Sequence, residues 1–149
     1  MRHRPRSGSE SRFSRPRARR LDTLRGMATD NERLVEEFCG AWAKRDVDGI
    51  LGYFTPDAVY HNIPLDPAVG LDAIRAVLEM FVPPADEIEF VIHKIMSDGD
   101  TVFTERTDRF VTDGKAIALP VAGVFELQGG KIAAWRDYFD LQTFMTQSA

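Results

Sequence analysis

One stretch near the C-terminal end, residues 131–141, constrains the fold most. It follows a Gly129-Gly130 turn and is dense in aromatic residues, so it is predicted to be a β-strand. Strand side chains alternate between two faces. The row that would contain Asp137 is otherwise apolar: Ala133, Trp135, Phe139 and Leu141. Burying a carboxylate in such a row is costly unless it is paired or protonated, so another part of the chain is expected to supply a partner.

Three further strands are predicted before this stretch, at residues 87–97, 101–111 and 115–127. Each shows alternating side-chain character, and turn signals separate them. An Asp-Gly pair between alternating segments, here Asp113-Gly114, is a strong signal for a two-residue hairpin. A short strand is predicted earlier, at residues 58–62. On the strand 115–127, Pro120 indicates a sheet edge or a bulge, because proline cannot donate a ladder hydrogen bond.

The first half of the chain predicts three helices. The helix at 29–44 begins with capping-box spacing and carries an apolar stripe that is expected to be core, with Cys39 as a small buried member. Asp46 is predicted to cap a short helix through residue 53, and Thr55-Pro56-Asp57 to form a turn. The third helix covers residues 71–81. Helices followed by an antiparallel meander indicate an α+β fold, a curved sheet wrapped around helices as a cone with a pocket.

The first 26 residues differ from the rest in composition. They hold nine arginines and only two acids, and almost no large apolar residues, so a disordered basic tail is predicted. No apolar segment of about 7–15 residues follows the charges, which excludes a secretory signal. A transit peptide, a nucleic-acid arm and translated sequence upstream of a start at Met27 stay open. Residues 27–149 are predicted to be a single catalytic domain.

Charge and cysteine content limit the classes of function. From Met27 onward, 10 Lys and Arg face 21 Asp and Glu, a net charge of −11, which argues against nucleic acid as a partner. No apolar run approaches the roughly 20 residues of a membrane span. The single cysteine, Cys39, excludes an internal disulfide and a cysteine-rich metal site, and it is compatible with a reducing cytosol. A cytoplasmic location is expected.

Hairpin register predicts which polar side chains meet. A two-residue Asp113-Gly114 turn sets Arg106 opposite Val121 on the apolar face of the next strand, with Asp108 two residues along. For the last hairpin, a two-residue turn would send Asp137 to the other face. We therefore predict a three-residue loop, 128–130, which sets Asp137 opposite Val121; with a shorter turn, only a compensating bulge would return Asp137 to that face. Strands lie about 4.8 Å apart, so Arg106 could then bridge both carboxylates.

Two carboxylates around one guanidinium indicate acid–base chemistry. Desolvation and mutual repulsion favour one of Asp108 and Asp137 keeping a proton near neutral pH, while Arg106 favours ionisation. The result would be one base and one acid, as general acid–base catalysis requires. From spacing alone, a structural salt-bridge cluster is an equal alternative.

Three motifs, in order and with closely similar spacing over residues 30–144, resemble the limonene-1,2-epoxide hydrolase family. They are Tyr60-His61-Asn62-Ile63-Pro64-Leu65, Thr104-Glu105-Arg106-Thr107-Asp108, and Gly123-Val124-Phe125 through Gly130-Lys131-Ile132 to Trp135-Arg136-Asp137-Tyr138-Phe139-Asp140-Leu141. The resemblance implies a cone-shaped α+β roll like that of nuclear transport factor and ketosteroid isomerase. It also implies a homodimer and a one-step hydrolysis without a covalent intermediate, with no cofactor and no metal.

The resemblance also implies roles for five residues. Asp137 would deprotonate a water that Tyr60 and Asn62 hold with it. Asp108 would protonate the epoxide oxygen, and Arg106 would orient both acids. Structural roles are expected for Trp135, Arg136, His61 and His93. The residues expected to form an apolar pocket wall are Leu78, Phe81, Phe110, Leu119, Val121, Phe139 and Phe144.

The predicted function is an epoxide hydrolase that adds water to a small apolar or terpene-like epoxide and gives a vicinal diol. A strained three-membered ether needs only a positioned water and a proton for the leaving oxygen. One alternative is an isomerase or dehydratase resembling ketosteroid isomerase, which needs one base and an oxyanion donor. Another is a non-catalytic ligand-binding module on the same scaffold.

Overall fold

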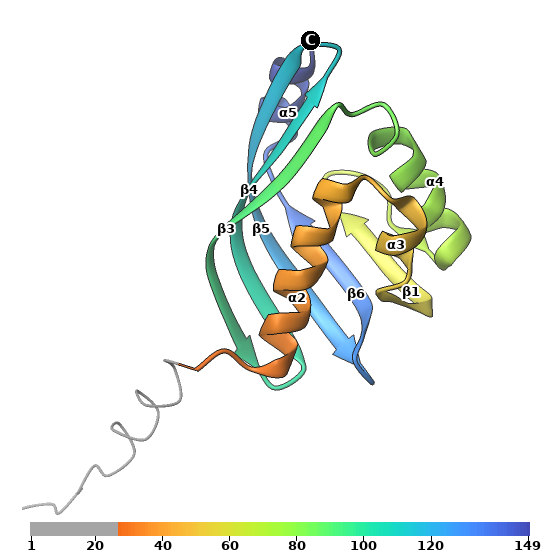
Figure 1. Ribbon diagram of the computed structural model, residues 1–149, viewed down its shortest axis with the longest axis vertical. Helices are drawn as coiled ribbons and strands as arrows, with labels where there is room; N and C mark the ends of the chain where they lie inside the picture. Colours follow the sequence, from red (N-terminus) through yellow and green to blue (C-terminus); the bar gives the residue numbers. More distant parts are fainter. Residues whose placement is uncertain (1–26) are drawn as a thin grey trace, which may run out of the picture.

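The computed structural model describes residues 27–149, so the basic tail predicted for residues 1–26 lies outside the described residues. A six-stranded curved sheet in the order β2-β1-β6-β5-β4-β3 dominates the domain (Figure 1). Its strands are β1 (Phe54–Asn62), β2 (Ala68–Val69), β3 (Glu87–Asp98), β4 (Thr101–Thr112), β5 (Lys115–Gln128) and β6 (Lys131–Tyr138). The helices are α2 (Asp30–Ala41), the 3-10 turn η1 (Trp42–Lys44), α3 (Val47–Leu51), α4 (Leu71–Phe81) and α5 (Leu141–Ser148).

Helix α2 lies against one face of the sheet and carries much of the core (Figure 1). Its start is the predicted capping box: Thr29 Oγ1 accepts from the Glu32 backbone N–H at 3.1 Å, and Glu32 accepts from the Thr29 N–H at 3.2 Å. Fully buried Phe38 packs edge-on against Trp135, with ring centroids 5.0 Å apart. Cys39 is buried beside it, as predicted. The α+β fold predicted from the sequence is confirmed.

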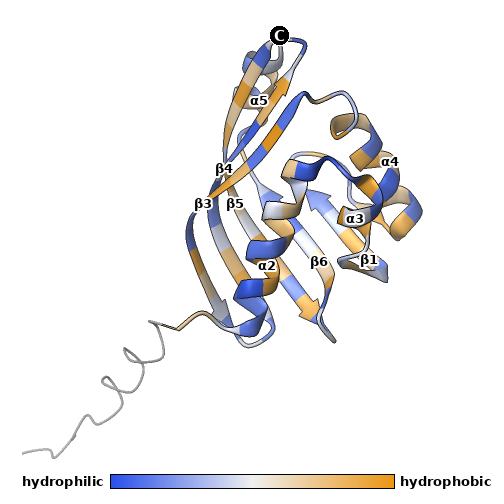
Figure 2. Cartoon of the chain, viewed as in Figure 1, coloured by the Kyte–Doolittle hydropathy of each residue, from blue (hydrophilic) through white to orange (hydrophobic). Residues whose placement is uncertain are grey.

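The β4–β5 hairpin follows the prediction in detail. Asp113 and Gly114 both have positive φ, 51° and 75°, which a two-residue type I′ turn requires. The resulting register sets Arg106 opposite Val121. Apolar and polar residues alternate along these strands (Figure 2). Pro120 pairs with Thr107 beyond the point where the β5–β6 register ends, so it occupies a locally open edge.

The predicted three-residue loop at 128–130 is wrong. Gly129 and Gly130, both with positive φ, form a two-residue turn that pairs Gln128 with Lys131. The register then shifts between Glu126 and Leu127, which makes Ala133 an extra residue in β6. This bulge returns Asp137 to the core face, but opposite Gly123 instead of Val121. Ile132, and not Ala133, is the buried residue before Trp135.

Three other local predictions also need correction. Residues 55–57 belong to β1 and do not form a turn; Pro56 lies where the β1–β6 register is irregular, which spares a ladder hydrogen bond. Asp46 precedes α3, but its side chain makes no capping hydrogen bond. Leu141 does not continue the last strand. It begins α5, because Asp140 caps that helix by accepting from the Thr143 N–H at 2.9 Å.

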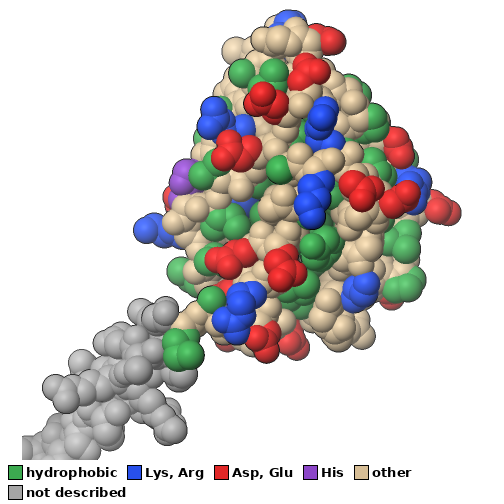
Figure 3. Space-filling view, viewed as in Figure 1, with side chains coloured by type: hydrophobic (Ala, Val, Ile, Leu, Met, Phe, Trp, Pro, Cys, Tyr) green, Lys and Arg blue, Asp and Glu red, His purple; other side chains and the backbone are tan. Residues whose placement is uncertain are grey.

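One face of the described domain is mixed in charge. On the face shown in Figure 3, acidic and basic side chains are interspersed and form no continuous basic surface. Within residues 27–149, no helix is both long enough and apolar enough to cross a membrane.

Candidate active site

Arg106 lies at the centre of the inward face of β4 and is 1% exposed. Its Nε and Nη2 donate to the two oxygens of Asp108 at 2.9 and 2.8 Å, a bidentate pair. Nη2 also donates to Asp137 Oδ2 at 2.8 Å, and Nη1 donates to Thr104 Oγ1 at 3.0 Å. The structure therefore has one guanidinium bridging both carboxylates, the arrangement that the sequence predicted.

Gly123 makes this crossing possible. It lies on β5 between Thr104 of β4 and Asp137 of β6. A Cβ atom at position 123 would overlap with Arg106 Nη1 and would lie 2.8 Å from Thr104 Oγ1 and 2.9 Å from Asp137 Oδ1. Sequence reasoning missed the roles of Gly123 and Thr104. The available signal was that Gly123 has no side chain, while its neighbours on the same face of β5 are apolar.

Trp135 holds the second oxygen of Asp137. Its Nε1–H donates to Asp137 Oδ1 at 2.7 Å, so each oxygen of this carboxylate has a donor. The fully buried indole is stacked between Tyr60, at 4.2 Å and 12°, and Phe125, at 5.4 Å and 13°. Trp135 therefore has the structural role that was expected and also a hydrogen bond to Asp137 that sequence reasoning missed. Trp135 and Asp137 are two residues apart on one strand face, and this spacing could have indicated the contact.

Tyr60 and Asn62 reach the site from β1, which runs parallel to β6. The register sets Tyr60 beside Trp135 and Asn62 beside Asp137. The Tyr60 hydroxyl donates to Asn62 Oδ1 at 3.1 Å. Burial raises the pKa of the Tyr60 phenol, with a further contribution from Asp137, so this group is a neutral hydroxyl at physiological pH.

The electrostatics of the cluster favour a base close to neutral pH. Burial raises the pKa of Asp137 to about 6, while Arg106 and the Trp135 hydrogen bond lower it and Asp108 raises it. Burial alone would lower the pKa of Arg106, but the attraction of Asp137 and the contacts with Asp108 outweigh it and hold that pKa well above the ordinary value. The guanidinium therefore stays charged whichever carboxylate holds a proton.

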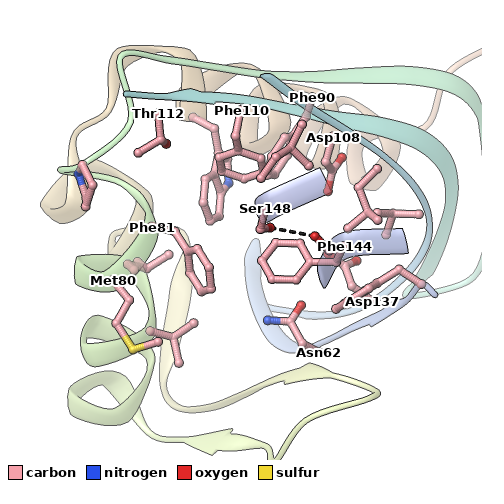
Figure 4. A pocket seen from close by; sticks show the side chains of 18 of the residues that line it. Asn62, Met80, Phe81, Phe90, Asp108, Phe110, Thr112, Asp137, Phe144 and Ser148 are labelled. Atoms are coloured by element: carbon pink, nitrogen blue, oxygen red, sulfur yellow. Dashed lines mark hydrogen bonds between the residues drawn. The ribbon is translucent and has the colours of Figure 1, made fainter. Parts of the chain in front are cut away.

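A cavity of about 390 Å³ opens in front of the cluster (Figure 4). Tyr60, Asn62, Asp108 and Asp137 line it, and Arg106 holds the carboxylates from behind. All seven residues of the predicted apolar wall also line it: Leu78, Phe81, Phe110, Leu119, Val121, Phe139 and Phe144. Its volume is within the usual range for small-molecule sites, roughly 300–1,000 Å³.

The remaining predicted residues make other contacts. His61 Nε2 lies 2.9 Å from the Leu65 carbonyl, and His93 Nε2 lies 2.7 Å from Thr107 Oγ1. Arg136 pairs with Glu126 at 2.7 Å on the surface, as its expected structural role requires. No group of three or more potential metal-ligating side chains occurs in the described part of the chain.

Comparison with known proteins identifies the family. The model of the limonene-1,2-epoxide hydrolase catalytic domain matches residues 29–149. The chain belongs to the limonene-1,2-epoxide hydrolase family. Membership makes it an enzyme of the epoxide hydrolase class and confirms the predicted class of function. It also sets aside the non-catalytic alternative.

Individual relatives of this epoxide hydrolase agree with that assignment. The chain is 37% identical over 112 residues to epoxide hydrolase EphG of Mycobacterium tuberculosis, covering 72% of this chain and 71% of the relative. The solved structure of an M. tuberculosis LEH-like epoxide hydrolase is 32% identical, with a TM-score of 0.70 and coverage of 79% of this chain and 88% of the other.

More distant structures show the fold alone. A putative SnoaL-like polyketide cyclase from Shewanella putrefaciens is 17% identical, with a TM-score of 0.73 over 82% of this chain and 98% of the other. A protein with a ketosteroid isomerase-like fold from Catenulispora acidiphila is 21% identical, with a TM-score of 0.69 over 77% and 91%. The cone that the sequence predicted is thus shared well beyond epoxide hydrolases.

Proposed function

We propose that this epoxide hydrolase adds water to a small apolar or terpene-like epoxide in one step and releases a vicinal diol. The observation that carries the proposal is the Asp108–Arg106–Asp137 cluster, whose two carboxylates line an apolar cavity while the guanidinium stays behind them. In the proposed step Asp137 acts as the base and Asp108 as the acid.

Asp137, Tyr60 and Asn62 are proposed to orient the attacking water. The Tyr60 hydroxyl donates its hydrogen bond to Asn62 Oδ1. Its oxygen therefore keeps lone pairs that can accept a hydrogen bond from water. If the other hydrogen of the water points to Asp137, a lone pair of the water oxygen is left facing the cavity. That is the orientation a nucleophile requires, and no cofactor or metal ion enters the proposed step.

The proposed step moves two protons and leaves the charge of the cluster unchanged. The water oxygen bonds to one ring carbon, the bond from that carbon to the ring oxygen breaks, Asp137 takes a proton from water, and Asp108 gives one to the leaving oxygen. Before and after, one guanidinium faces one carboxylate and one carboxylic acid. This constancy matters because a change in net charge is expensive in a buried site.

Diol formation from limonene oxide and cyclohexene oxide tests the proposal, with chiral analysis of the product. The Asp137→Asn variant should lose activity by about 10²–10⁴-fold, the usual contribution of a general base. Asp57→Asn is the matched control, because Asp57 is exposed on β1 and does not line the cavity. Equal rates for the wild type and Asp137→Asn would remove Asp137 from the mechanism.

A single turnover in ¹⁸O-labelled water distinguishes the one-step route from a covalent route. The label should appear in the diol after one turnover. Label found in an enzyme carboxylate would instead indicate an ester intermediate. Conversion of an enone steroid in the absence of any diol product would favour the isomerase alternative.

We further propose that the enzyme is a homodimer in the cytoplasm, as the sequence led us to expect. Supporting the dimer, Met96 and Phe103 lie opposite each other on β3 and β4 with 60% and 41% of their surfaces exposed. Exposed apolar side chains of this kind are common at interfaces. Light scattering coupled to gel filtration measures the mass directly, and fractionation of the native host locates the protein.

A further inference from the structure

The cavity has a second polar end, far from the catalytic carboxylates. It runs along the β4–β5 hairpin, where three cross-strand pairs line it in succession: Asp108 with Leu119, Phe110 with Ile117, and Thr112 with Lys115. Asp108 and Thr112 share a strand face and are four residues apart, so about 14 Å separates them at roughly 3.4 Å per residue. Figure 4 shows Asp108, Phe110 and Thr112 following one another along this wall.

Burial decreases steadily towards that second end. On β5, Leu119 is buried at 6% exposure, Ile117 is half-buried and Lys115 is exposed. The catalytic carboxylates therefore lie at the closed end of the cavity, and Lys115 lies at its mouth. Aromatic side chains form the segment between them, where Phe81 and Phe144 meet edge-on with ring centroids 6.3 Å apart.

Two of the hydrogen-bond donors at the mouth have no side-chain partner in the described residues. Within residues 27–149, neither the Lys115 ammonium nor the Thr112 hydroxyl makes a side-chain hydrogen bond or ion pair. The hydroxyl of Ser148, which also lines the cavity, is occupied, because it donates to the Phe144 carbonyl at 2.7 Å. Asp113 is the other charged residue lining this end, and its carboxylate is not within ion-pair distance of Lys115.

We propose that Lys115 and Thr112 form an anchoring subsite for an anionic oxygen group, a carboxylate, at the far end of an amphipathic epoxide substrate. The apolar segment of such a substrate would fill the aromatic part of the cavity, and its oxirane ring would lie beside Asp108 and Asp137. The proposal rests on the proposed hydrolysis and names its substrate class. A compact neutral epoxide occupies only the closed end.

A series of terminal-epoxy alkanoic acids of increasing chain length, paired with their neutral methyl esters, tests the subsite. Wild-type kcat/KM should favour the acid over its ester at one optimal length. Lys115→Met should raise KM for that acid about fivefold, the order of a partly solvated ion pair, and leave the ester unchanged. Added salt should reduce the preference, because it screens exposed charges.

Two further variants sharpen the result. Asp113→Asn should lower KM for the acid, because it removes the competing negative charge at the mouth. Lys94→Met is the matched control, since Lys94 is exposed on β3, opposite Glu105, and does not line the cavity. Equal kcat/KM for acid and ester in the wild type would overturn the proposal. So would a change in Lys115→Met that is the same for both substrates, or that Lys94→Met reproduces.

Binding separates failure of the subsite from failure of the proposed reaction. Calorimetry on Asp137→Asn should show that a medium-chain alkanoate binds more tightly than the alkanol of equal length, and that Lys115→Met removes the difference. If no epoxide is hydrolysed, the proposed function fails while this measurement still decides the subsite. Tighter binding of the alkanol would contradict the subsite directly.

Discussion

Replacing Gly123 by alanine should disable the active site through a single methyl group. The added Cβ would overlap with Arg106 Nη1 and would lie within 2.9 Å of both Thr104 Oγ1 and Asp137 Oδ1. Real Cβ atoms do not approach polar atoms so closely, and three polar groups converge on this point. Because Arg106 is fully buried between its partners, the guanidinium has to leave its bidentate position.

The size of the effect follows from packing and from catalytic geometry. Overpacking a well-filled interior costs about 1–3 kcal/mol. A displacement of about 1 Å in a catalytic group costs about 10²-fold in rate. We therefore expect Gly123→Ala to fold with a lower Tm and to lose about 10²-fold in kcat/KM, as measured by calorimetry and by diol formation.

The matched control is Gly40→Ala, in helix α2. An added Cβ there meets nothing within 4 Å, and alanine is favoured over glycine in a helix by about 1 kcal/mol. Gly40→Ala should therefore keep full activity and gain stability. Wild-type activity and Tm in Gly123→Ala would refute the reasoning, because the guanidinium would then have room that the structure does not show.

Three further predictions follow from the surroundings of Asp137 and Cys39. Burial raises the pKa of Asp137 to about 6, and only the ionised carboxylate can accept a proton. The value of kcat/KM should therefore fall as the pH decreases through about 6. A pH profile that stays flat down to pH 4 would contradict this prediction. Trp135→Phe keeps an aromatic ring in the stack but removes the hydrogen bond that lowers the pKa of Asp137. The acidic limb of the pH profile should therefore move to higher pH, and kcat/KM should fall about 10- to 100-fold. If the acidic limb does not move, the role of Trp135 is packing only. The Cys39 thiol is 2% exposed and burial raises its pKa to about 12, so a thiol reagent should label it only after denaturation; rapid labelling of the native enzyme would indicate that α2 opens.

Local features determined much of the fold from the sequence. The Asp113-Gly114 turn and the alternation around it were enough to set Arg106 opposite Val121, because a tight hairpin determines its own register. The capping box at Thr29 likewise marked the start of α2. The grouping of Arg106 with Asp108 is local too, since residues two apart on a strand share a face.

Asp137 shows the limit of such reasoning. The sequence required this carboxylate to face the core, and it does, but the proposed loop was wrong because a bulge at Ala133 supplies the extra residue. A bulge has little local signal. It is favoured here because it sends both Trp135 into the aromatic core and Asp137 to Arg106.

The sequence by itself determined most of the helices and strands, though not β2 or α5, together with the β4–β5 register and the five candidate catalytic residues. Only the tertiary structure decided how those residues meet. The parallel pairing of β1 with β6, which brings Asn62 beside Asp137, joins segments some 75 positions apart in the chain. The absence of a side chain at Gly123 matters only because the Arg106 guanidinium occupies the space that a Cβ atom would fill. Both depend on packing between distant segments, which no local pattern encodes.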